Sequence, residues 1–448
     1  VISLHCPAAA KPHGKTLTCS PGQHINHIMR VLLVNTSERT GGAAIAANRL
    51  CEALGNNGVK AKMLVSRKET GLITVTEPHN RLQYKLNFLR ERLTILAANK
   101  FRRHRLFEVD AANCGIDITG LKEFRQADII HLHWVNQGFI SLAGIAKIVK
   151  SGKPVVWTMH DMWPFTGICH YTRSCEQYKD ECGNCPILYG GGAPNDLSHR
   201  VFVKKLRLLG NARIAYVGCS DWLANCARES RLLEGKRILS IPNPINTKLY
   251  QPDSKTEARK ALKLPQDKKL LLFAAFRVTN KIKGIDYLCE AIRMLVEKNP
   301  ALGNEIAIVA VGKESEALAG ALPVDVYPMG YITNEHRMIK TYNACDLFLI
   351  PTLQDNLPNT IMESMACGVP CIGFDIGGLP QMIDHLENGY IARYKDSADF
   401  ARGIEWALSQ TDTRALGEKA RTKVMASFSE TAVAKLYTKL YKELSGKE

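Results

Sequence analysis

Long apolar runs are absent from this sequence of 448 residues. A membrane-spanning helix needs about 20 consecutive apolar residues, whereas the longest runs, such as residues 270–276, have the length of a buried strand. Residues 1–28 also lack the unbroken apolar stretch that a secretory signal requires. We therefore expect a cytoplasmic protein whose fold begins at Met29, with residues 1–28 as an extension outside it.

Several ligand-binding signatures are absent as well. The turn after the first apolar run is neither a G-x-G-x-x-G fingerprint nor a Walker loop, which disfavours a nicotinamide-dependent enzyme and a P-loop ATPase. No Asp-x-Asp triplet occurs, so nothing indicates a divalent metal that would clamp a diphosphate. Cationic side chains would have to take the place of such a metal.

Positive charge, in contrast, is in excess. The chain has 59 Lys and Arg against 43 Asp and Glu, a formal net charge of +16, which favours phosphates, nucleic acid or an acidic membrane face as partners. Apolar residues make up 46 % and charged residues 23 %, as in an ordinary globular enzyme. In a cytoplasmic protein, the 14 cysteines would be mostly thiols or metal ligands rather than disulfides.

Apolar runs of strand length alternate with helical patterns along nearly the whole chain. This alternation predicts parallel sheets with helices on both faces, and two successive series predict two doubly wound α/β domains. We expect these domains at residues 29–243 and 244–428, followed by a helix at 429–448 that packs back across the join. The two series comprise residues 31–34, 63–65, 129–132, 155–159 and 214–217, and then 270–276, 306–311, 324–327, 347–350, 371–374 and 390–392.

Ligands of open α/β sheets bind beyond the carboxyl ends of the strands, so residues that directly follow strand patterns are candidates for the site. Gly41 and Gly42 lie between the first strand and the first helix. Glycines there would let an anion approach the free N–H groups of the helix. A tight turn with no ligand is an equally good interpretation.

Two further pairs of residues lie on strands of the first series or directly after them. His160 and Asp161 follow the strand at residues 155–159, so the histidine is expected to point into the cleft, with bonding to local backbone as the alternative. His131 and His133 alternate along a strand and share one of its faces. Structural packing is the better explanation for that second pair.

Two charged motifs follow strands of the second series. Arg277 and Lys283 lie on a loop that opens a helix at Gly284, an arrangement that suits a diphosphate, although unpaired surface cations are the alternative. The block at residues 355–370 opens on Asp355 and carries Glu363 within a predicted helix. Both carboxylates can face the cleft and accept hydrogen bonds from polyols, and this block is the most specific signal in the chain.

These motifs together resemble the retaining GT-B glycosyltransferases of glycosyltransferase family 4. The resemblance extends from about Met29 to the C-terminus. That family typically carries two glutamates separated by seven residues, and this chain keeps the spacing but has Asp355 in the first position. The elements that carry the resemblance are the Gly41-Gly42 turn, residues 158–161, residues 241–246 with Tyr250 and Pro252, the Arg277 and Lys283 pair, and the block at 355–370.

The resemblance implies two Rossmann-like domains that face an interdomain cleft, with the acceptor on the first domain and a UDP- or GDP-sugar on the second. Glu363 would bind the ribose hydroxyls of the donor. Asp355, with the backbone of Asn356 and Leu357, would hold the hydroxyls of the donor sugar. Shortening the first carboxylate by one methylene leaves its role less defined than that of Glu363.

The remaining roles implied by the resemblance concern the diphosphate and the acceptor. Arg277 and Lys283 would neutralise the leaving diphosphate, so the chemistry would need no metal or other cofactor. His160 would lie beside the donor sugar, with Asp161 also at the substrate. Gly41 and Gly42 would approach the phosphates or the acceptor.

The implied reaction is transfer of a hexosyl group, with retention, to a hydroxyl of a saccharide or lipid-linked saccharide, in surface polysaccharide biosynthesis. Two alternatives stay open. One is a nucleotide-sugar epimerase of the same architecture, which the block at residues 355–370 disfavours. The other is a nucleic-acid-binding protein, which is suggested only by the net charge and lacks a recognisable binding module.

Four cysteines fall within one insertion, residues 163–195, in the pattern C-x5-C-x6-C-x2-C. Four thiols in so short a span suit a tetrahedral structural Zn²⁺, and His170 is a further candidate ligand. Two disulfides, or four free thiols lining a loop, are the alternatives. The cysteines are Cys169, Cys175, Cys182 and Cys185.

Residues 81–107 combine basic and apolar side chains. A helix there would be amphipathic and could lie on the anionic inner face of a membrane, which a lipid-linked acceptor would favour. A solvated helix with its apolar stripe in the core is an equally good interpretation.

Overall fold

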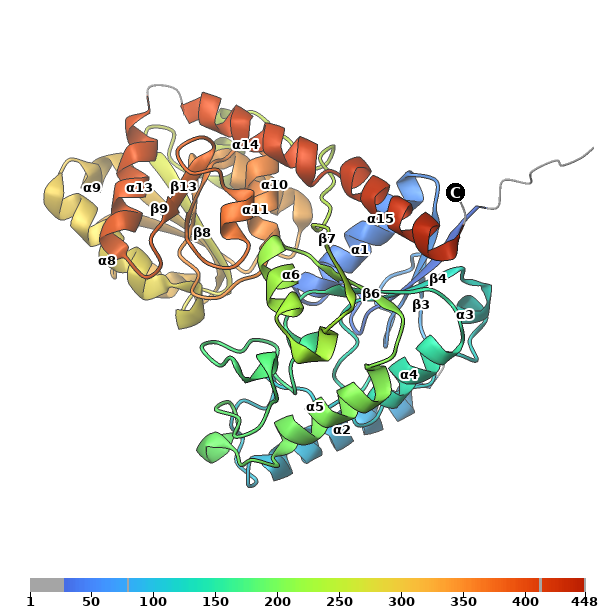
Figure 1. Cartoon of the computed structure of the whole chain (residues 1–448). Helices are drawn as coiled ribbons and strands as arrows, with labels where there is room; N and C mark the ends of the chain where they lie inside the picture. The colour runs from blue at the N-terminus through green and yellow to red at the C-terminus, as the bar shows by residue number, and fades with distance from the viewer. Residues whose placement is uncertain (1–27, 79, 411–412, 447–448) are drawn as a thin grey trace, which may run out of the picture.

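The computed structural model describes residues 28–78, 80–410 and 413–446. The extension expected at residues 1–28 lies outside the described residues, apart from Ile28. The molecule has two lobes, each built on one parallel sheet, and the chain passes between them beside Ile245 and again beside Ser429, which form a β-bridge (Figure 1).

The N-terminal lobe contains a parallel sheet of seven strands in the order β3-β2-β1-β4-β5-β6-β7. The order reverses beside β1, which is the doubly wound arrangement, so the loops after β1 and β4 open a crevice at the carboxyl edge. The strands are β1 (Arg30–Val34), β2 (Lys60–Leu64), β3 (Val75–Thr76), β4 (Ile129–Leu132), β5 (Val155–Met159), β6 (Ile214–Gly218) and β7 (Arg237–Ser240).

The C-terminal lobe repeats this plan with six parallel strands in the order β10-β9-β8-β11-β12-β13. Its switch point lies between β8 and β11. The prediction of two doubly wound α/β domains is therefore confirmed. The strands are β8 (Lys269–Arg277), β9 (Ile306–Lys313), β10 (Asp325–Gly330), β11 (Leu347–Ile350), β12 (Cys371–Phe374) and β13 (Gly389–Ala392).

Helices cover both faces of each sheet (Figure 1). The N-terminal lobe has α1 (Gly42–Asn56), α2 (Arg81–Ala98), α3 (Lys122–Gln126), α4 (Leu142–Lys150), α5 (Leu197–Leu209) and α6 (Asp221–Arg228). The C-terminal lobe has α7 (Lys255–Leu262), α8 (Ile285–Lys298), α9 (Leu302–Glu305), α10 (Glu335–Ala344), α11 (Asn359–Ala366), α12 (Leu379–Met382), α13 (Ser397–Ser409) and α14 (Thr413–Ser427). The last helix, α15 (Glu430–Ser445), returns to the N-terminal lobe and packs on α1.

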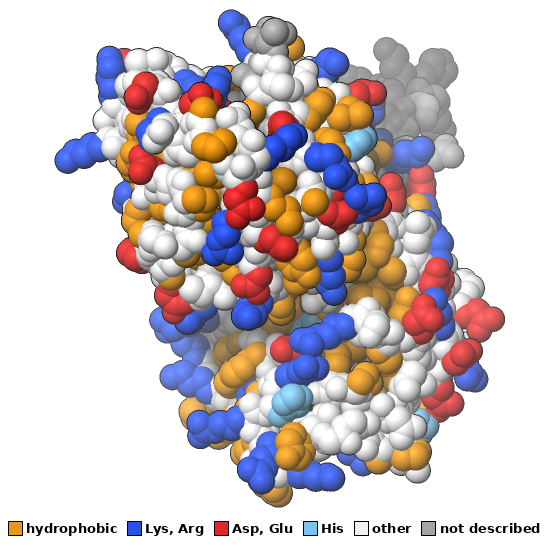
Figure 2. Space-filling model, turned by 90° about the vertical axis from the view of Figure 1, so that its left-hand side faces the viewer, with side chains coloured by type: hydrophobic (Ala, Val, Ile, Leu, Met, Phe, Trp, Pro, Cys, Tyr) orange, Lys and Arg blue, Asp and Glu red, His pale blue; other side chains and the backbone are white. Residues whose placement is uncertain are grey.

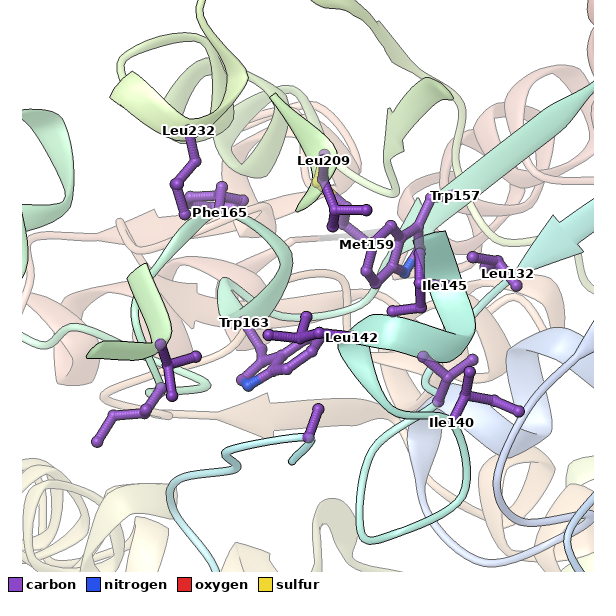
Figure 3. Packing of buried hydrophobic residues seen from close by; sticks show 14 of the residues in the cluster. Leu132, Ile140, Leu142, Ile145, Trp157, Met159, Trp163, Phe165, Leu209 and Leu232 are labelled. Carbon is purple, nitrogen blue, oxygen red and sulfur yellow. The ribbon is translucent and has the colours of Figure 1, made fainter. Parts of the chain in front are cut away.

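The core of the N-terminal lobe includes the start of the cysteine-rich insertion. Figure 3 shows Trp163 and Phe165, which follow β5, packed among side chains of the strands and of α4 and α5. The Trp157 and Trp163 rings lie 6.1 Å apart, centroid to centroid. Burial of one such side chain contributes about 1.5–3 kcal/mol, so the insertion is anchored at its first residues by apolar packing.

The helix α15 is held on the N-terminal sheet by a buried polar network as well as by apolar contacts. The Tyr441 hydroxyl lies 2.7 Å from Nδ1 of His131, whose Nε2 lies 2.8 Å from Oγ1 of Thr158. The Thr158 hydroxyl in turn lies 2.8 Å from the Tyr437 hydroxyl. Burial lowers the pKa of His131 to about 3, so the ring stays neutral. The packing role predicted for His131 is consistent with these contacts.

No helix in the described parts of the chain is both long and apolar enough to cross a membrane.

We predict that Tyr441→Phe destabilises the protein by about 1–3 kcal/mol, because it leaves Nδ1 of the buried His131 without its partner. The measurement is the free energy of unfolding in urea. Tyr189→Phe is the matched control, since Tyr189 is exposed and loss of its hydroxyl should change stability by less than about 0.5 kcal/mol. Equal stability of Tyr441→Phe and wild type would show that this network does not hold α15.

Candidate active site

The candidate site lies where the carboxyl edges of the two sheets face each other. The loop after β5 and the loop after β11 meet directly there, because Nδ2 of Asn356 donates to the carbonyl oxygen of His160 at 3.2 Å. At the start of α11, Nδ2 of Asn359 donates to the carbonyl oxygen of Gly42 at 3.3 Å. Figure 2 shows a hollow between the two lobes with Lys and Arg side chains beside it.

The block at residues 355–370 forms the C-terminal wall of this site. Pro358 has φ −66° and is the N-cap residue, directly before α11. Asp355 lies in the preceding loop, where its Oδ2 accepts a hydrogen bond from Nζ of Lys283 at 2.7 Å. The structure therefore brings together the first carboxylate of the block and one of the two predicted cations. Leu357 is buried in the core of the C-terminal lobe, so its side chain does not face the site.

The position of Lys283 depends on close packing around Gly284. This glycine has φ +79°, and a Cβ on it would lie 1.7 Å from the carbonyl oxygen of Pro351. Only glycine fits there. The backbone N–H of Leu353 donates to the Ile282 carbonyl at 2.8 Å, which ties the cationic loop to the loop that carries Asp355.

Arg277 is placed differently from Lys283. Its Nη1 donates to Glu314 at 2.5 Å, and its side chain is 54 % exposed. The Thr279 hydroxyl donates to the same carboxylate. The structure thus pairs Arg277 with Glu314, so a role at the diphosphate would require this surface ion pair to open. Such exposed pairs contribute little stability, about 0–1 kcal/mol.

Glu363 faces the N-terminal lobe and is almost fully buried. Its Oε1 accepts from Nη2 of Arg49 on α1 at 2.7 Å, and its Oε2 accepts from the Tyr342 hydroxyl at 2.8 Å. Arg49 also donates to the Tyr250 hydroxyl at 3.0 Å and lies 3.8 Å from Glu335. Sequence reasoning missed Arg49, because a cation on the apolar side of a first-domain helix carries no sign of a partner in the other domain.

Asn356 joins the two lobes more extensively than the backbone role predicted for it. Besides its bond to His160, its Nδ2 donates to Sγ of Cys219 at 2.9 Å, and its Oδ1 accepts from the Ser220 hydroxyl. Its carbonyl accepts from the N–H of Gly378 at 2.7 Å. The side chain therefore fixes the loop of Asp355 against the ends of β5 and β6.

His160 is half-buried and stacks on the buried imidazole of His133. Its Nε2 lies 2.9 Å from Nδ1 of His133, and the His133 ring lies 4.3 Å from that of His131. Burial lowers the pKa of His160 to about 4, although the Asp161 charge opposes the shift. His160 is thus neutral near pH 7, and it offers the site a carbonyl oxygen and an uncharged ring.

Asp161 lies in a buried chain of alternating charges. Its Oδ2 lies 2.7 Å from Nδ1 of His170, whose Nε2 lies 2.7 Å from Oδ2 of Asp110. Burial opposes a charge on His170, but the two carboxylates raise its pKa to about 10, so both ring nitrogens donate. The indole N–H of Trp134 also donates to Asp161 at 2.9 Å. Asp161 is therefore committed to protein partners and lies beside the site as a support.

The cysteine-rich insertion contributes side chains to the edge of the site. His170 directly follows Cys169, and the next residue, Tyr171, lies close to the charges of Asp355 and Asp161, which together with burial raise its pKa. Sequence reasoning weighed His170 only as a metal ligand.

Gly41 and Gly42 form the opposite wall. Gly41 has φ +93° and precedes α1, and a Cβ on it would meet no atom within 4 Å. The turn therefore needs glycine for its backbone conformation rather than for lack of space. The helix α1 begins at Gly42 without a side-chain cap, so its first N–H groups have no partner within the helix.

The four cysteines of the insertion line one small cavity, together with residues such as Thr172 and Tyr178. All four are free thiols. Within the described residues, no group of three or more His, Cys, Asp or Glu side chains is arranged to hold a metal ion as it stands.

Comparison with known proteins identifies the family. Residues 40–249 match the family described as Glycosyltransferase Family 4, and residues 254–423 match Glycosyl transferases group 1. The chain belongs to these glycosyltransferases. The resemblance seen in the motifs is thereby confirmed, and the protein is an enzyme of the glycosyltransferase class.

Individual relatives agree with this assignment. A D-inositol 3-phosphate glycosyltransferase of Thermobispora bispora is 25 % identical over 333 residues, which cover 70 % of each chain. The glycosyl transferase WcaC of Escherichia coli K12, whose name refers to colanic acid biosynthesis, is 28 % identical over 257 residues, 54 % of this chain and 58 % of that protein.

Solved structures show the same GT-B architecture. HepE of Anabaena, described as a complex with UDP and as a complex with UDP-glucose, aligns with TM-scores of 0.61 and 0.60. The alignments cover 93 % of this chain and 100 % of HepE, at 15 % identity. This glycosyltransferase thus shares the fold of HepE over nearly its whole length.

Proposed function

We propose that this glycosyltransferase transfers a sugar, with retention of configuration, from a UDP- or GDP-sugar to a hydroxyl of a saccharide or lipid-linked saccharide. The observation that carries the proposal is the contact between Lys283 and Asp355 at the start of α11. It places a cation and a carboxylate side by side at the carboxyl edge of the second sheet. The cation can neutralise a diphosphate, and the carboxylate can accept hydrogen bonds from sugar hydroxyls.

Glu363 is proposed to accept hydrogen bonds from the ribose. A carboxylate has about four lone-pair sites, and Arg49 and Tyr342 use one on each oxygen. Capacity remains for ribose hydroxyls once the lobes separate far enough to admit the nucleotide. The complexes of HepE with UDP and UDP-glucose support a nucleotide-sugar donor.

The proposed chemistry depends on stabilising the leaving diphosphate. Breaking the anomeric bond develops negative charge on the diphosphate and positive charge on the sugar, so fixed cations next to the phosphates lower the barrier. Lys283 is proposed to supply that charge with the first N–H groups of α1, and Arg277 joins if its pair with Glu314 opens. The neutral His160 would not repel the oxocarbenium-like sugar.

An acceptor bound to lipid is supported by the surface of α2. Four leucines that share one face of this helix, Leu82, Leu86, Leu89 and Leu93, are 51–69 % exposed. Lys85 and Arg90 are exposed on the same helix. Exposed apolar side chains flanked by cations fit an anionic membrane face, and the relative WcaC supports a role in polysaccharide biosynthesis.

The function is tested by incubating the protein with a panel of UDP- and GDP-sugars and following slow hydrolysis of each. We predict that sugars of one nucleotide are hydrolysed and that the same free nucleotide raises the melting temperature. A ligand at 100 times its Kd should stabilise the fold by about 2.7 kcal/mol. Conversion of a donor to its epimer would instead indicate an epimerase, and stabilisation by oligonucleotides alone would indicate a nucleic-acid-binding protein.

We predict that Glu363→Gln lowers nucleotide-sugar affinity about ten- to one-hundredfold, because a charged hydrogen-bond acceptor contributes about 1.5–3 kcal/mol. The measurement is donor binding by calorimetry. Unfolding in urea should show a separate loss of stability, because the buried Arg49 loses its partner.

Arg49→Gln is the matched control for this variant. It removes the same interdomain ion pair but keeps the Glu363 carboxylate, so its stability should fall while donor affinity stays within about threefold of wild type. An equal loss of affinity in both variants would mean that Glu363 acts only by joining the lobes, and the ribose role would be withdrawn.

We also predict that a brief exposure to EDTA leaves transfer within about twofold of the untreated rate. Side-chain cations, rather than a divalent metal, are proposed to carry the diphosphate charge. The metal content of the protein is measured before and after, so that loss of a slowly exchanging structural ion is not mistaken for loss of a catalytic one. Activity that vanishes within seconds and returns with Mg²⁺ or Mn²⁺ would contradict the proposal.

A further inference from the structure

The cysteine-rich insertion encloses a small cavity. It contains only short 3-10 turns and loops, yet Cys169, Cys182 and Cys185 are buried. The cavity lined by these three residues and Cys175 has a volume of about 10 Å³, which is close to the space of one water molecule. Four cysteines that are separated in the sequence of the insertion therefore line a cavity large enough for one ion.

The packing around the cavity brings the backbone close to one of the sulfur atoms. The N–H of Gly167 donates to Sγ of Cys182 at 3.3 Å. Gly167 is constrained by this packing, because a Cβ on it would lie 2.6 Å from the Ser198 carbonyl oxygen and 3.1 Å from Cβ of Cys182.

A buried lysine fastens the insertion to α5. Lys205 on α5 is 2 % exposed, and its Nζ donates to the carbonyl oxygens of Trp163 and Thr166. These hydrogen bonds hold the start of the insertion, which leads into the segment that carries the four cysteines.

We propose that Cys169, Cys175, Cys182 and Cys185 bind one structural Zn²⁺ in the cavity that they line. Zinc with four thiolates is tetrahedral, with Zn–S distances of about 2.3 Å. Since the four thiols do not yet stand at ligand spacing, binding requires their side chains to turn into the cavity.

The proposed zinc site adjoins the candidate active site in the sequence, because its ligand Cys169 directly precedes His170. Cys169 is followed by His170, which lies between Asp161 and Asp110, and then by Tyr171, which lies near Asp355. A fixed Cys169 would hold these two residues at the edge of the cleft. This consequence for catalysis rests on the proposed function, whereas zinc binding itself does not.

Metal analysis of untagged protein decides whether zinc is bound. We expect one zinc per chain in wild type, less than about 0.2 in Cys182→Ser, and an unchanged content in the matched control Cys289→Ser, whose thiol lies in the C-terminal lobe. Titration of native protein with a mercurial reagent should release that zinc as four thiols react. Because this second measurement uses wild type, it stands even if Cys182→Ser fails to fold.

Three results would overturn the proposal. They are a zinc content near zero with all four thiols freely reactive, a mass that shows two disulfides under non-reducing conditions, or an equal zinc content in Cys182→Ser and wild type. Where zinc is present, Cys182→Ser should lower acceptor-dependent transfer at least tenfold more than nucleotide binding. Equal losses of the two would leave the zinc site intact and withdraw only its link to the cleft.

Discussion

The buried ion pair between Arg49 and Glu363 is the contact on which the arrangement of the two lobes depends. It joins α1 of one sheet to α11 of the other, at the carboxyl edges where ligands of such sheets bind. Both side chains are about 10 % exposed, and separating two buried charges leaves each without compensation. The same carboxylate that joins the lobes is proposed to receive the nucleotide, so Glu363 has both a structural contact and a proposed ligand contact.

A second chain of charges supports the N-terminal side of the site. Arg92 of α2 pairs with Asp110, and His170 then links that carboxylate to Asp161. Cations and carboxylates alternate along this chain, so each buried charge has an opposite neighbour. The helix with the exposed leucines is thereby connected to the motif beside the cleft, through side chains that lie beneath the surface.

The strands of the fold could be predicted where each strand consists of an uninterrupted run of apolar residues. The bounds of β4, β5, β11 and β12 follow directly from their buried sequences, whereas β3 and β7 were missed because edge strands need no continuous apolar run. β3 has two residues, and β7 is only partly buried. The carboxylates Asp355 and Glu363 were found because seven intervening residues and a helix form a local pattern.

Their partners could not be found in the same way. Arg49 lies 314 positions from Glu363, and Asp110 lies 60 from His170. Such contacts arise only when separate elements pack, and no local spacing encodes them. Arg277 is the opposite case. Its position after a strand predicts a site residue, but in the structure its guanidinium forms an ion pair with Glu314.

The path of α15 bears on how the molecule is made. This helix supplies Val433, Tyr437 and Tyr441 to the apolar layer that also contains β1 and α1, so one face of the first sheet is covered by residues made some 400 positions later. During synthesis that face stays open while the whole second lobe is produced. Until then α1 alone covers that part of the layer, so some of its apolar surface stays exposed during synthesis. Final closure of the first lobe is among the last events of folding, although its strands are the first to be made.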